Sequence, residues 1–213
     1  MNKIIEFKTK NNQIFEMITV ERNLIENYLN EIAQFRIKYF KSYPYLYVGN
    51  LEYEKEYING YANNSKSLLI LALYNGKIIG VSTALPLNSN ADILGEAPVL
   101  FAKKGLNINE YFYYGEIIVK TEFQGIGIAA KIYDMQESYA KAEGFKKIIL
   151  ATVNRRPNDP RKPSDYFNTD IVWNKLGFKK CNIQINYNWP TITENGSIKD
   201  INNPMDFWTK EIK

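Results

Sequence analysis

Hydrophobic residues in the first part of the chain recur at helical spacing, and short apolar runs between them fit strands. From residue 24 to residue 40 they return every three or four positions, which predicts an amphipathic helix. This helix should end before Pro44, because the residue ahead of a proline is pushed out of the helical region. A shorter helix is predicted at Leu51–Tyr61 and a first strand at Phe15–Val20.

Two further apolar runs, Ser67–Tyr74 and Lys77–Leu85, are joined by the dipeptide Asn75-Gly76. Asparagine and glycine tolerate the positive φ angles that a two-residue hairpin turn requires. The sequence therefore predicts a β-hairpin. The segment Pro86–Asn109 that follows is predicted to be irregular, with room for a short helix.

The second half of the chain alternates strand-like and helix-like segments. Predicted strands are Tyr111–Lys120, Lys147–Val153, Lys180–Trp189 and a short Asp206–Glu211, and predicted helices are a segment from Ile128 to Gly144 and one around Asn168–Leu176. The strand at 147–153 is almost wholly apolar, which is typical of a central strand. This order predicts an α/β (α+β) fold, with helices on both faces of one sheet and a single domain over residues 1–213.

Composition excludes several kinds of site. The chain has no histidine, which excludes a serine–histidine triad, a histidine base and a histidine metal site. Its one cysteine, Cys181, excludes an intramolecular disulfide and a cysteine-cluster metal site, so we expect no metal. A free thiol fits a reducing compartment, and charges inside the N-terminal apolar run argue against a signal peptide. No apolar run approaches a membrane span, so we expect a cytoplasmic protein that binds no membrane.

The stretch from Tyr114 to Ala130 carries the clearest chemistry. A strand that contains Glu116 leads into Gln124-Gly-Ile-Gly-Ile-Ala129, where two glycines precede a helix. Glycines let the backbone approach a ligand closely, and the free amides and dipole of a helix start favour a phosphate. The stretch therefore predicts a phosphate cradle beside a carboxylate. A dinucleotide-binding fold is disfavoured, because the third glycine is missing and the two present lie past mid-chain.

This loop resembles the acyl-CoA motif of the GNAT N-acetyltransferases, Gln/Arg-x-x-Gly-x-Gly/Ala. Residues Trp173–Phe178 are similar to that superfamily's late helix-to-strand element, and Met205–Lys210 to its closing strand. The resemblance covers nearly the whole chain. It implies the GNAT fold, a mixed and mostly antiparallel sheet in which two parallel strands splay apart. Tyr43–Tyr47, Gly115-Glu116 and the loop Arg156–Pro163 are similar to a bacterial subgroup of unknown substrate.

The resemblance implies acetyl-CoA as co-substrate and direct transfer of its acetyl group to an amine, carried by a small molecule or a peptide. Strand and loop backbone would hold the pantetheine arm and the pyrophosphate; the implied cofactor-binding residues are Ile117, Ile118, Val119, Gln124, Gly125, Ile126, Gly127, Ile128 and Ala129. Asn154 is either a further cofactor contact or a plain strand-end residue. Tyr43, Tyr45 and Tyr47 are candidate acceptor contacts, and a core role fits them as well.

Glu116 is the implied general base, because an attacking amine must be neutral and a buried carboxylate can accept its proton. The alternative is a structural charge paired with a lysine. Many family members place a tyrosine acid where this chain has Trp173, so Tyr166 and Tyr114 are the candidate general acids. The leaving thiolate could also take its proton from water or from the amine. Trp173 also leaves open an alternative function, a non-catalytic acyl-CoA-binding sensor.

The loop Arg155–Pro163 is rich in proline and basic residues. It either contacts the cofactor 3′-phosphate or an anionic acceptor, or is a solvated surface. A nucleic-acid-binding role through this loop is a weaker alternative, because the net charge is only +4 and the charges are well mixed. We therefore expect no nucleic-acid partner, and a monomer or a homodimer.

Overall fold

The computed structural model describes residues 3–9, 12–20, 22–89 and 92–213. Residues 90–91 of the predicted irregular segment and the first two residues of the N-terminal apolar run lie outside the described range. Within that range the strands are β1 (Lys3–Lys8), β2 (Ile14–Val20), β3 (Leu68–Tyr74), β4 (Lys77–Pro86), β5 (Tyr111–Val119), β6 (Lys147–Val153), β7 (Lys179–Ile192) and β8 (Ile198–Glu211). The α-helices are α1 (Leu29–Phe40), α2 (Leu51–Ala62), α3 (Ala97–Lys103), α4 (Ile128–Ala142) and α5 (Asp170–Lys175). Short 3₁₀ helices cover Arg22–Tyr28, Asp92–Leu94, Ile108–Glu110 and Thr121–Phe123.

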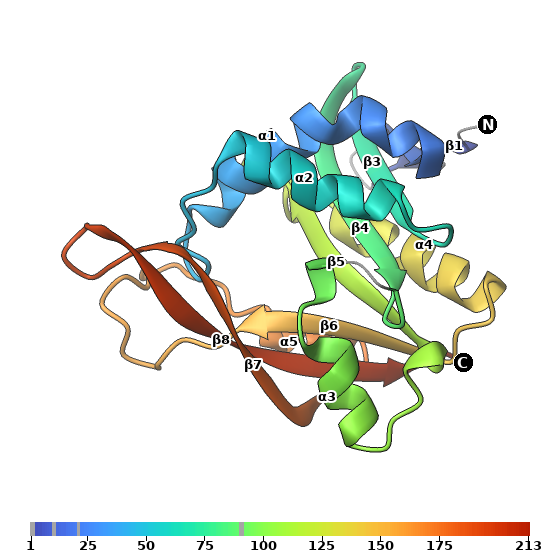
Figure 1. The fold of residues 1–213 in the computed structure, drawn as a ribbon. Coiled ribbons are helices and arrows are strands. Elements are labelled where there is room, and N and C mark those ends of the chain that lie inside the picture. Colours follow the sequence, from blue (N-terminus) through green and yellow to red (C-terminus); the bar gives the residue numbers. More distant parts are fainter. Residues whose placement is uncertain (1–2, 10–11, 21, 90–91) are drawn as a thin grey trace.

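The strands form one sheet in the order β1-β2-β3-β4-β5-β6-β8-β7. Neighbours pair antiparallel except β5 and β6, which run parallel. This parallel pairing covers only Tyr111 to Tyr114 of β5, and it ends where Tyr114 faces Leu150. Figure 1 shows the two strands diverging beyond that point. The predicted mixed sheet with a splayed parallel pair is therefore confirmed.

Helices cover both faces of the sheet, as predicted. Residues of α1, α2 and α3, among them Ile32, Ile58 and Phe101, pack into the core on one face. On the other face α4 packs through Ile128 and Ile132, and Trp173 of α5 joins the same cluster. No helix in the described part of the chain is long and apolar enough to cross a membrane.

The predicted hairpin is also confirmed. Asn75 and Gly76 join β3 to β4 with φ angles of 49° and 71°. The central place of β6 is confirmed, since this strand lies between β5 and β8.

The prediction of a short closing strand was wrong. Strands β7 and β8 pair antiparallel from Lys179 with Thr209 to Ile192 with Ile198, with a register shift between Lys180 and Gln184. They form a long arm that reaches past the rest of the sheet in Figure 1. Sequence patterning missed it for two physical reasons. Pro190 and Pro204 lie inside the strands, although proline usually argues against a strand interior. Near its end the arm is also rich in asparagine, so it lacks the apolar alternation of a half-buried strand.

Candidate active site

Two cavities lie on either side of the divergence between β5 and β6. The larger holds about 750 Å³ and is bounded by the first turn of α4, by β6 and by the segment from residue 154 to residue 173. The smaller holds about 560 Å³ and is bounded by α1, α2 and β7. The residues that line both cavities are Phe40, Tyr45, Gly115, Glu116 and Ala151. The cavities therefore meet at Glu116.

A β-bulge at Gly115 decides which way Glu116 points. Thr83 of β4 pairs with Glu116 and the next residue, Ala84, pairs with Tyr114, which leaves Gly115 without a partner. The extra residue shifts the alternation of side chains by one. Tyr113 and Glu116 consequently face the α1–α2 side, whereas Tyr114 and Ile117 face α4.

Only glycine fits at this bulge. A Cβ atom on Gly115 would lie 2.2 Å from the hydroxyl oxygen of Tyr61 and 2.7 Å from the hydroxyl oxygen of Thr83. Real Cβ atoms do not approach other heavy atoms so closely, so any side chain would force the strand or its neighbours to move. The glycine therefore fixes the position of the adjacent Glu116.

Glu116 lies in a buried ionic cluster. Nη1 of Arg36 donates to Oε2 of Glu116 at 2.7 Å, and Nε of Arg36 donates to Oε2 of Glu54. The side chains of Glu116 and Glu54 are 2% and 0% exposed. Oε1 of Glu116 is buried and is not contacted by Arg36, and the buried hydroxyl of Thr83 on β4 lies close enough to donate to this carboxylate. One arginine is thus shared by two carboxylates, and Thr83 is the other group placed to hydrogen-bond Glu116. The alternative of a structural charge paired with a lysine was wrong in its partner, because the partner is Arg36.

Burial raises the pKa of Glu116 above its ordinary value, and the positive charge of Arg36 and a hydrogen bond from the hydroxyl of Thr83 offset this only in part. The like charge of Glu54 raises it further. Burial alone would lower the pKa of Arg36, but the charge of Glu116 and its other neighbours keep that pKa well above the ordinary value. The cluster therefore holds a permanent cation beside a carboxylate that is more basic than usual.

Neither Arg36 nor Glu54 was singled out in the sequence. A signal was present, because both are charged residues within the apolar stripe of their helices. Arg36 follows the buried Phe35 on α1, and Glu54 lies four residues before the buried Ile58 on α2. Buried charges are normally paired, so two opposite charges on neighbouring apolar stripes favour a buried salt bridge.

The predicted phosphate cradle has the expected geometry at the start of α4. Gly127 caps the helix with a φ of 97°, Gly125 has a φ of 77°, and no side chain caps the first turn. Its amide groups are therefore free to receive an anion. Ala129 and Ala130 of this turn line the larger cavity. The side-chain amide of Gln124 donates to the carbonyl of Val119 at 2.9 Å, which ties the loop to β5.

The loop Tyr43–Tyr47, which follows α1, forms a wall between the two cavities. Tyr45 lines both cavities, Tyr47 only the smaller one and Tyr43 only the larger one, where its ring packs edge-on against Tyr166. Of the three tyrosines predicted to contact the acceptor, two therefore lie at the smaller cavity. Burial raises the pKa of Tyr45 to about 12, so its hydroxyl is neutral at physiological pH.

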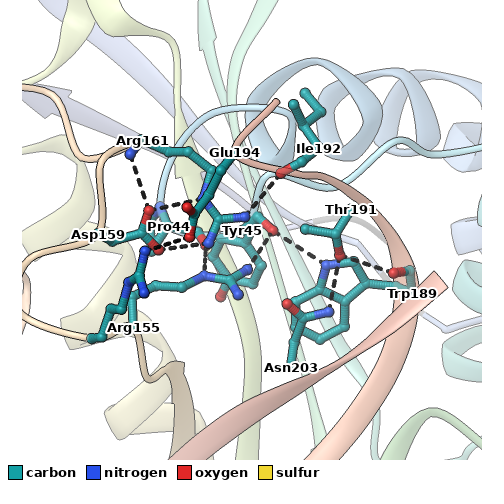
Figure 2. Close-up of polar contacts among 11 residues, drawn as sticks. Pro44, Tyr45, Arg155, Asp159, Arg161, Trp189, Thr191, Ile192, Glu194 and Asn203 are labelled. Atoms are coloured by element: carbon teal, nitrogen blue, oxygen red, sulfur yellow. Dashed lines mark hydrogen bonds and ion pairs between the residues drawn. The ribbon is translucent and has the colours of Figure 1, made fainter. Parts of the chain in front are cut away.

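Contacts from two distant segments hold this wall, as Figure 2 shows. Arg155 donates through Nε to the carbonyl of Pro44 at 2.8 Å and through Nη2 to that of Tyr45 at 3.0 Å. Trp189 of β7 donates to the same Tyr45 carbonyl at 3.2 Å. Arg161 donates through Nε to the carboxylate of Asp159 and through Nη1 to the carbonyl of Ile192. Arg155 of the basic loop thus positions the wall, while Arg161 pairs within the loop and bonds to β7.

The remaining predicted residues divide between the larger cavity and the core. Those that line the larger cavity are Ile117, Asn154, Tyr114 and Tyr166. The side chains of Ile118, Val119 and Ile128 are buried in the core, and Ile126 does not line the cavity. Nδ2 of Asn154 donates to Asp206 at 2.9 Å, and Lys180 donates to the same carboxylate at 2.8 Å. The buried hydroxyl of Tyr114 and the buried indole nitrogen of Trp173 have no hydrogen-bond partner among the described residues. Tyr114, Tyr166 and Trp173 are therefore brought to the same cavity, while Glu116 lies where it opens toward the other.

Comparison with known proteins supports the resemblance to the GNAT acetyltransferases. The sequence model of the acetyltransferase (GNAT) family matches residues 30–161. No curated protein matches the chain. Solved structures with the same fold include an N-acetyltransferase from Staphylococcus aureus Mu50, with 14% identity, coverage of 93% of this chain and 99% of that chain, and a TM-score of 0.56.

A protein from Salmonella typhimurium proposed to be an acetyltransferase, solved with its cofactor acetyl-CoA, has 10% identity, coverage of 92% and 94%, and a TM-score of 0.56. An aminoglycoside 6′-N-acetyltransferase solved with coenzyme A has 15% identity, coverage of 99% and 97%, and a TM-score of 0.54. These similarities confirm the predicted fold. Because the family model covers more than half of the sequence, the chain belongs to the acetyltransferase (GNAT) family.

Proposed function

We propose that this protein transfers the acetyl group of acetyl-CoA directly to an amine, with Glu116 as the general base. One observation carries the proposal: two cavities on opposite sides of the β5–β6 split meet at a buried carboxylate with one oxygen that Arg36 does not contact. Such an arrangement lets two substrates approach one reaction centre from opposite sides, which favours direct transfer over a covalent enzyme intermediate.

The larger cavity is assigned to acetyl-CoA. Its end at Ala129 and Ala130 offers the free amides of a helix start, which suit a pyrophosphate. The pairing of β5 with β6 ends at Tyr114, so the backbone from Ile117 to Val119 is available to the pantetheine arm. When bound, acetyl-CoA supplies an activated acyl group, and amides near Val119 are the proposed donors to its carbonyl oxygen.

Glu116 acts on the acceptor. An amine arrives mainly as an ammonium ion and must lose a proton before its nitrogen can attack. The raised pKa of Glu116 makes this carboxylate a better proton acceptor than an exposed one. Its Oε1 takes the proton, either from the amine or through one water, while Arg36 holds Oε2 and fixes the side chain.

The general acid remains a choice between Tyr114 and Tyr166. The hydroxyl of Tyr114 is buried without a partner, so it has a donor to offer in the larger cavity. Tyr166 is half-buried and packs against Tyr43. Trp173, at the place where many family members carry the tyrosine, favours a second candidate function, an acyl-CoA sensor without turnover.

Binding and turnover measured together test the proposal. Ala130→Glu places a carboxylate in the proposed pyrophosphate site, at a helix position where glutamate is well tolerated. We expect it to weaken acetyl-CoA binding in calorimetry by roughly tenfold or more, since like charges repel in a partly buried site. Ser138→Glu adds the same charge on an exposed part of α4 and should leave binding unchanged. Equal affinity in both variants would overturn the assignment.

Release of free coenzyme A thiol with a panel of amines distinguishes the enzyme from the sensor. Steady release that depends on the amine supports acetyl transfer. Tight binding of acetyl-CoA without release across the panel would instead identify a sensor.

A further inference from the structure

Aromatic side chains line part of the smaller cavity, among them Phe40, Tyr47, Tyr53, Tyr57, Tyr187 and Trp189. The larger cavity also has aromatic residues, but only the smaller one combines them with more acidic than basic side chains. At about 560 Å³ it lies within the usual size range of small-molecule sites, roughly 300–1,000 Å³. Aromatic rings attract cations through their negative faces and also pack against hydrocarbon. The aromatic lining therefore suits a small molecule with a positive charge and an apolar body.

The charged residues of this cavity also favour a positively charged ligand. Its charged lining residues are one arginine, Arg36, and two acids, Glu116 and Asp200. The buried Glu54 lies directly behind Arg36, so the cluster of one arginine and two glutamates carries a net negative charge. Oε1 of Glu116, in a side chain that is 98% buried, is not contacted by Arg36, and the hydroxyl of Thr83 is the donor that lies close to this carboxylate. A carboxylate oxygen accepts more than one hydrogen bond, so Oε1 can also accept from an ammonium group.

Arg36 is poorly placed to attract an anion into the cavity. Two of its nitrogens already donate to carboxylates. Its guanidinium carbon lies 4.0 Å from the ring centre of Tyr57 and 4.9 Å from that of Phe40, so aromatic rings pack against it. An acceptor carboxylate or phosphate would have to displace these contacts and lie near Glu116. The cavity is thus unfavourable for an anionic group.

We propose that the acceptor is a small primary ammonium ion on an apolar body, an alkylamine or arylalkylamine that carries no carboxylate or phosphate. The inference rests on the proposed function and adds the chemical class of the acceptor. The ammonium group lies at Glu116, where it loses its proton to Oε1, and the hydrocarbon part lies against the aromatic lining.

Matched pairs of ligands test this inference. With acetyl-CoA present, kcat/KM for phenethylamine should exceed that for phenylalanine, which differs by a carboxylate, by about tenfold or more. Benzyltrimethylammonium cannot be acetylated, so its binding to the smaller cavity is measured by calorimetry without any need for turnover. It should bind more tightly than phenylacetate, an anion of similar size. Equal or tighter binding of phenylacetate would overturn the proposal.

Two variants at the rim locate the binding. Tyr53 is 59% exposed and lines the cavity, so Tyr53→Leu should weaken benzyltrimethylammonium binding by about two- to fivefold, whereas Tyr53→Phe keeps the ring and should not. Asp200→Asn should weaken it by about twofold. Lys199→Gln changes the neighbouring charge on β8 outside the lining residues and should not weaken binding. Unchanged affinity in both Tyr53→Leu and Asp200→Asn would place the cation elsewhere and overturn the proposal.

The experiment separates this inference from the proposed function. Tight acetyl-CoA binding without selective binding of the cation would overturn the acceptor class and leave acetyl transfer standing. Selective binding of the cation that depends on Tyr53 and Asp200, in a protein that does not bind acetyl-CoA, would support the cation site while the proposed function fails.

Discussion

The two cavities that meet at Glu116 differ in charge and in lining. The larger is lined by four basic and three acidic side chains: Arg155, Arg156, Lys162 and Lys180 against Glu116, Asp170 and Asp206. The smaller is lined by one basic and two acidic side chains. In the larger cavity Lys180 pairs with Asp170 and Asp206, and Arg156 pairs with Glu194, so its excess of positive charge is small. Under the proposed function the acidic excess of the smaller cavity therefore separates the acceptor from the anionic cofactor more than the basic residues of the larger cavity do.

Glu116, one of the residues that line both cavities, is held by elements from both halves of the chain. Glu116 comes from β5, while Arg36 and Glu54 come from α1 and α2. The bulge at Gly115 turns Glu116 toward these helices and leaves Tyr114 on the other face. A single extra residue in β5 therefore separates the proposed base from a candidate acid. The predictions below test this separation, from the largest effect to the smallest.

The first prediction removes the base. Glu116→Gln keeps the shape of the side chain and can still accept from Arg36, but it cannot take a proton from an amine. We expect kcat to fall by about 10²-fold or more, with little change in acetyl-CoA affinity. The rise of turnover with pH should also flatten, because the carboxylate that must lose its proton is gone. Measurement of kcat across pH checks both effects; unchanged turnover would assign the proton to another base or to water.

The second prediction removes the space at the bulge. In Gly115→Ala the new Cβ atom would overlap the hydroxyl oxygen of Tyr61, so β5 must shift and Glu116 with it. We expect a loss of about 1–3 kcal/mol in the free energy of unfolding and a fall in kcat of up to about 10²-fold. Adding Tyr61→Phe to Gly115→Ala removes that oxygen and should restore part of the free energy of unfolding and part of kcat. Wild-type melting temperature and turnover in Gly115→Ala would contradict the role given to the bulge.

Much of the fold could be predicted because its signals are local. The Asn75-Gly76 turn, the glycines before α4 and the apolar run of β6 each depend on nearby residues only. The extension of β8 back to Ile198 could not be predicted, because Pro204 lies inside the strand and residues 198–203 pair only with β7. The prediction of a single domain from residue 1 to residue 213 is untested.

The candidate site likewise contains residues that could be predicted from the sequence and residues that could not. The cradle and Glu116 could be singled out because one motif contains them. Arg36 lies 80 residues before Glu116 in the sequence and contacts it, at 2.7 Å, only in the folded chain, where Arg36 also pairs with Glu54. The assignment of Tyr43, Tyr45 and Tyr47 to one pocket depended on a loop whose side chains point to different cavities. Sequence spacing carries no information about such a division.

The third prediction concerns the charge behind the base. Glu54 raises the pKa of Glu116, so Glu54→Gln, which can still accept from Arg36, should lower that pKa. The pH at which turnover is half-maximal should therefore move to lower pH, and the plateau should fall a few-fold because a weaker base removes the proton. Glu52→Gln, on the exposed side of the same helix, is the control and should leave the profile unchanged. A shift to higher pH, or none, would contradict the prediction.

The smallest effect is expected at the wall between the cavities. Arg155 holds the carbonyls of Pro44 and Tyr45, so Arg155→Gln should loosen the wall without touching Glu116. Since Tyr45 lines the acceptor cavity, we expect the KM of the acceptor to rise about two- to fivefold while kcat changes little. Arg156→Gln is the matched control, because Arg156 pairs with the exposed Glu194 and should leave the acceptor KM unchanged. If Arg155→Gln raised the KM of acetyl-CoA instead, this arginine would belong to the cofactor side, and the division of the two cavities at Tyr45 would have to be redrawn.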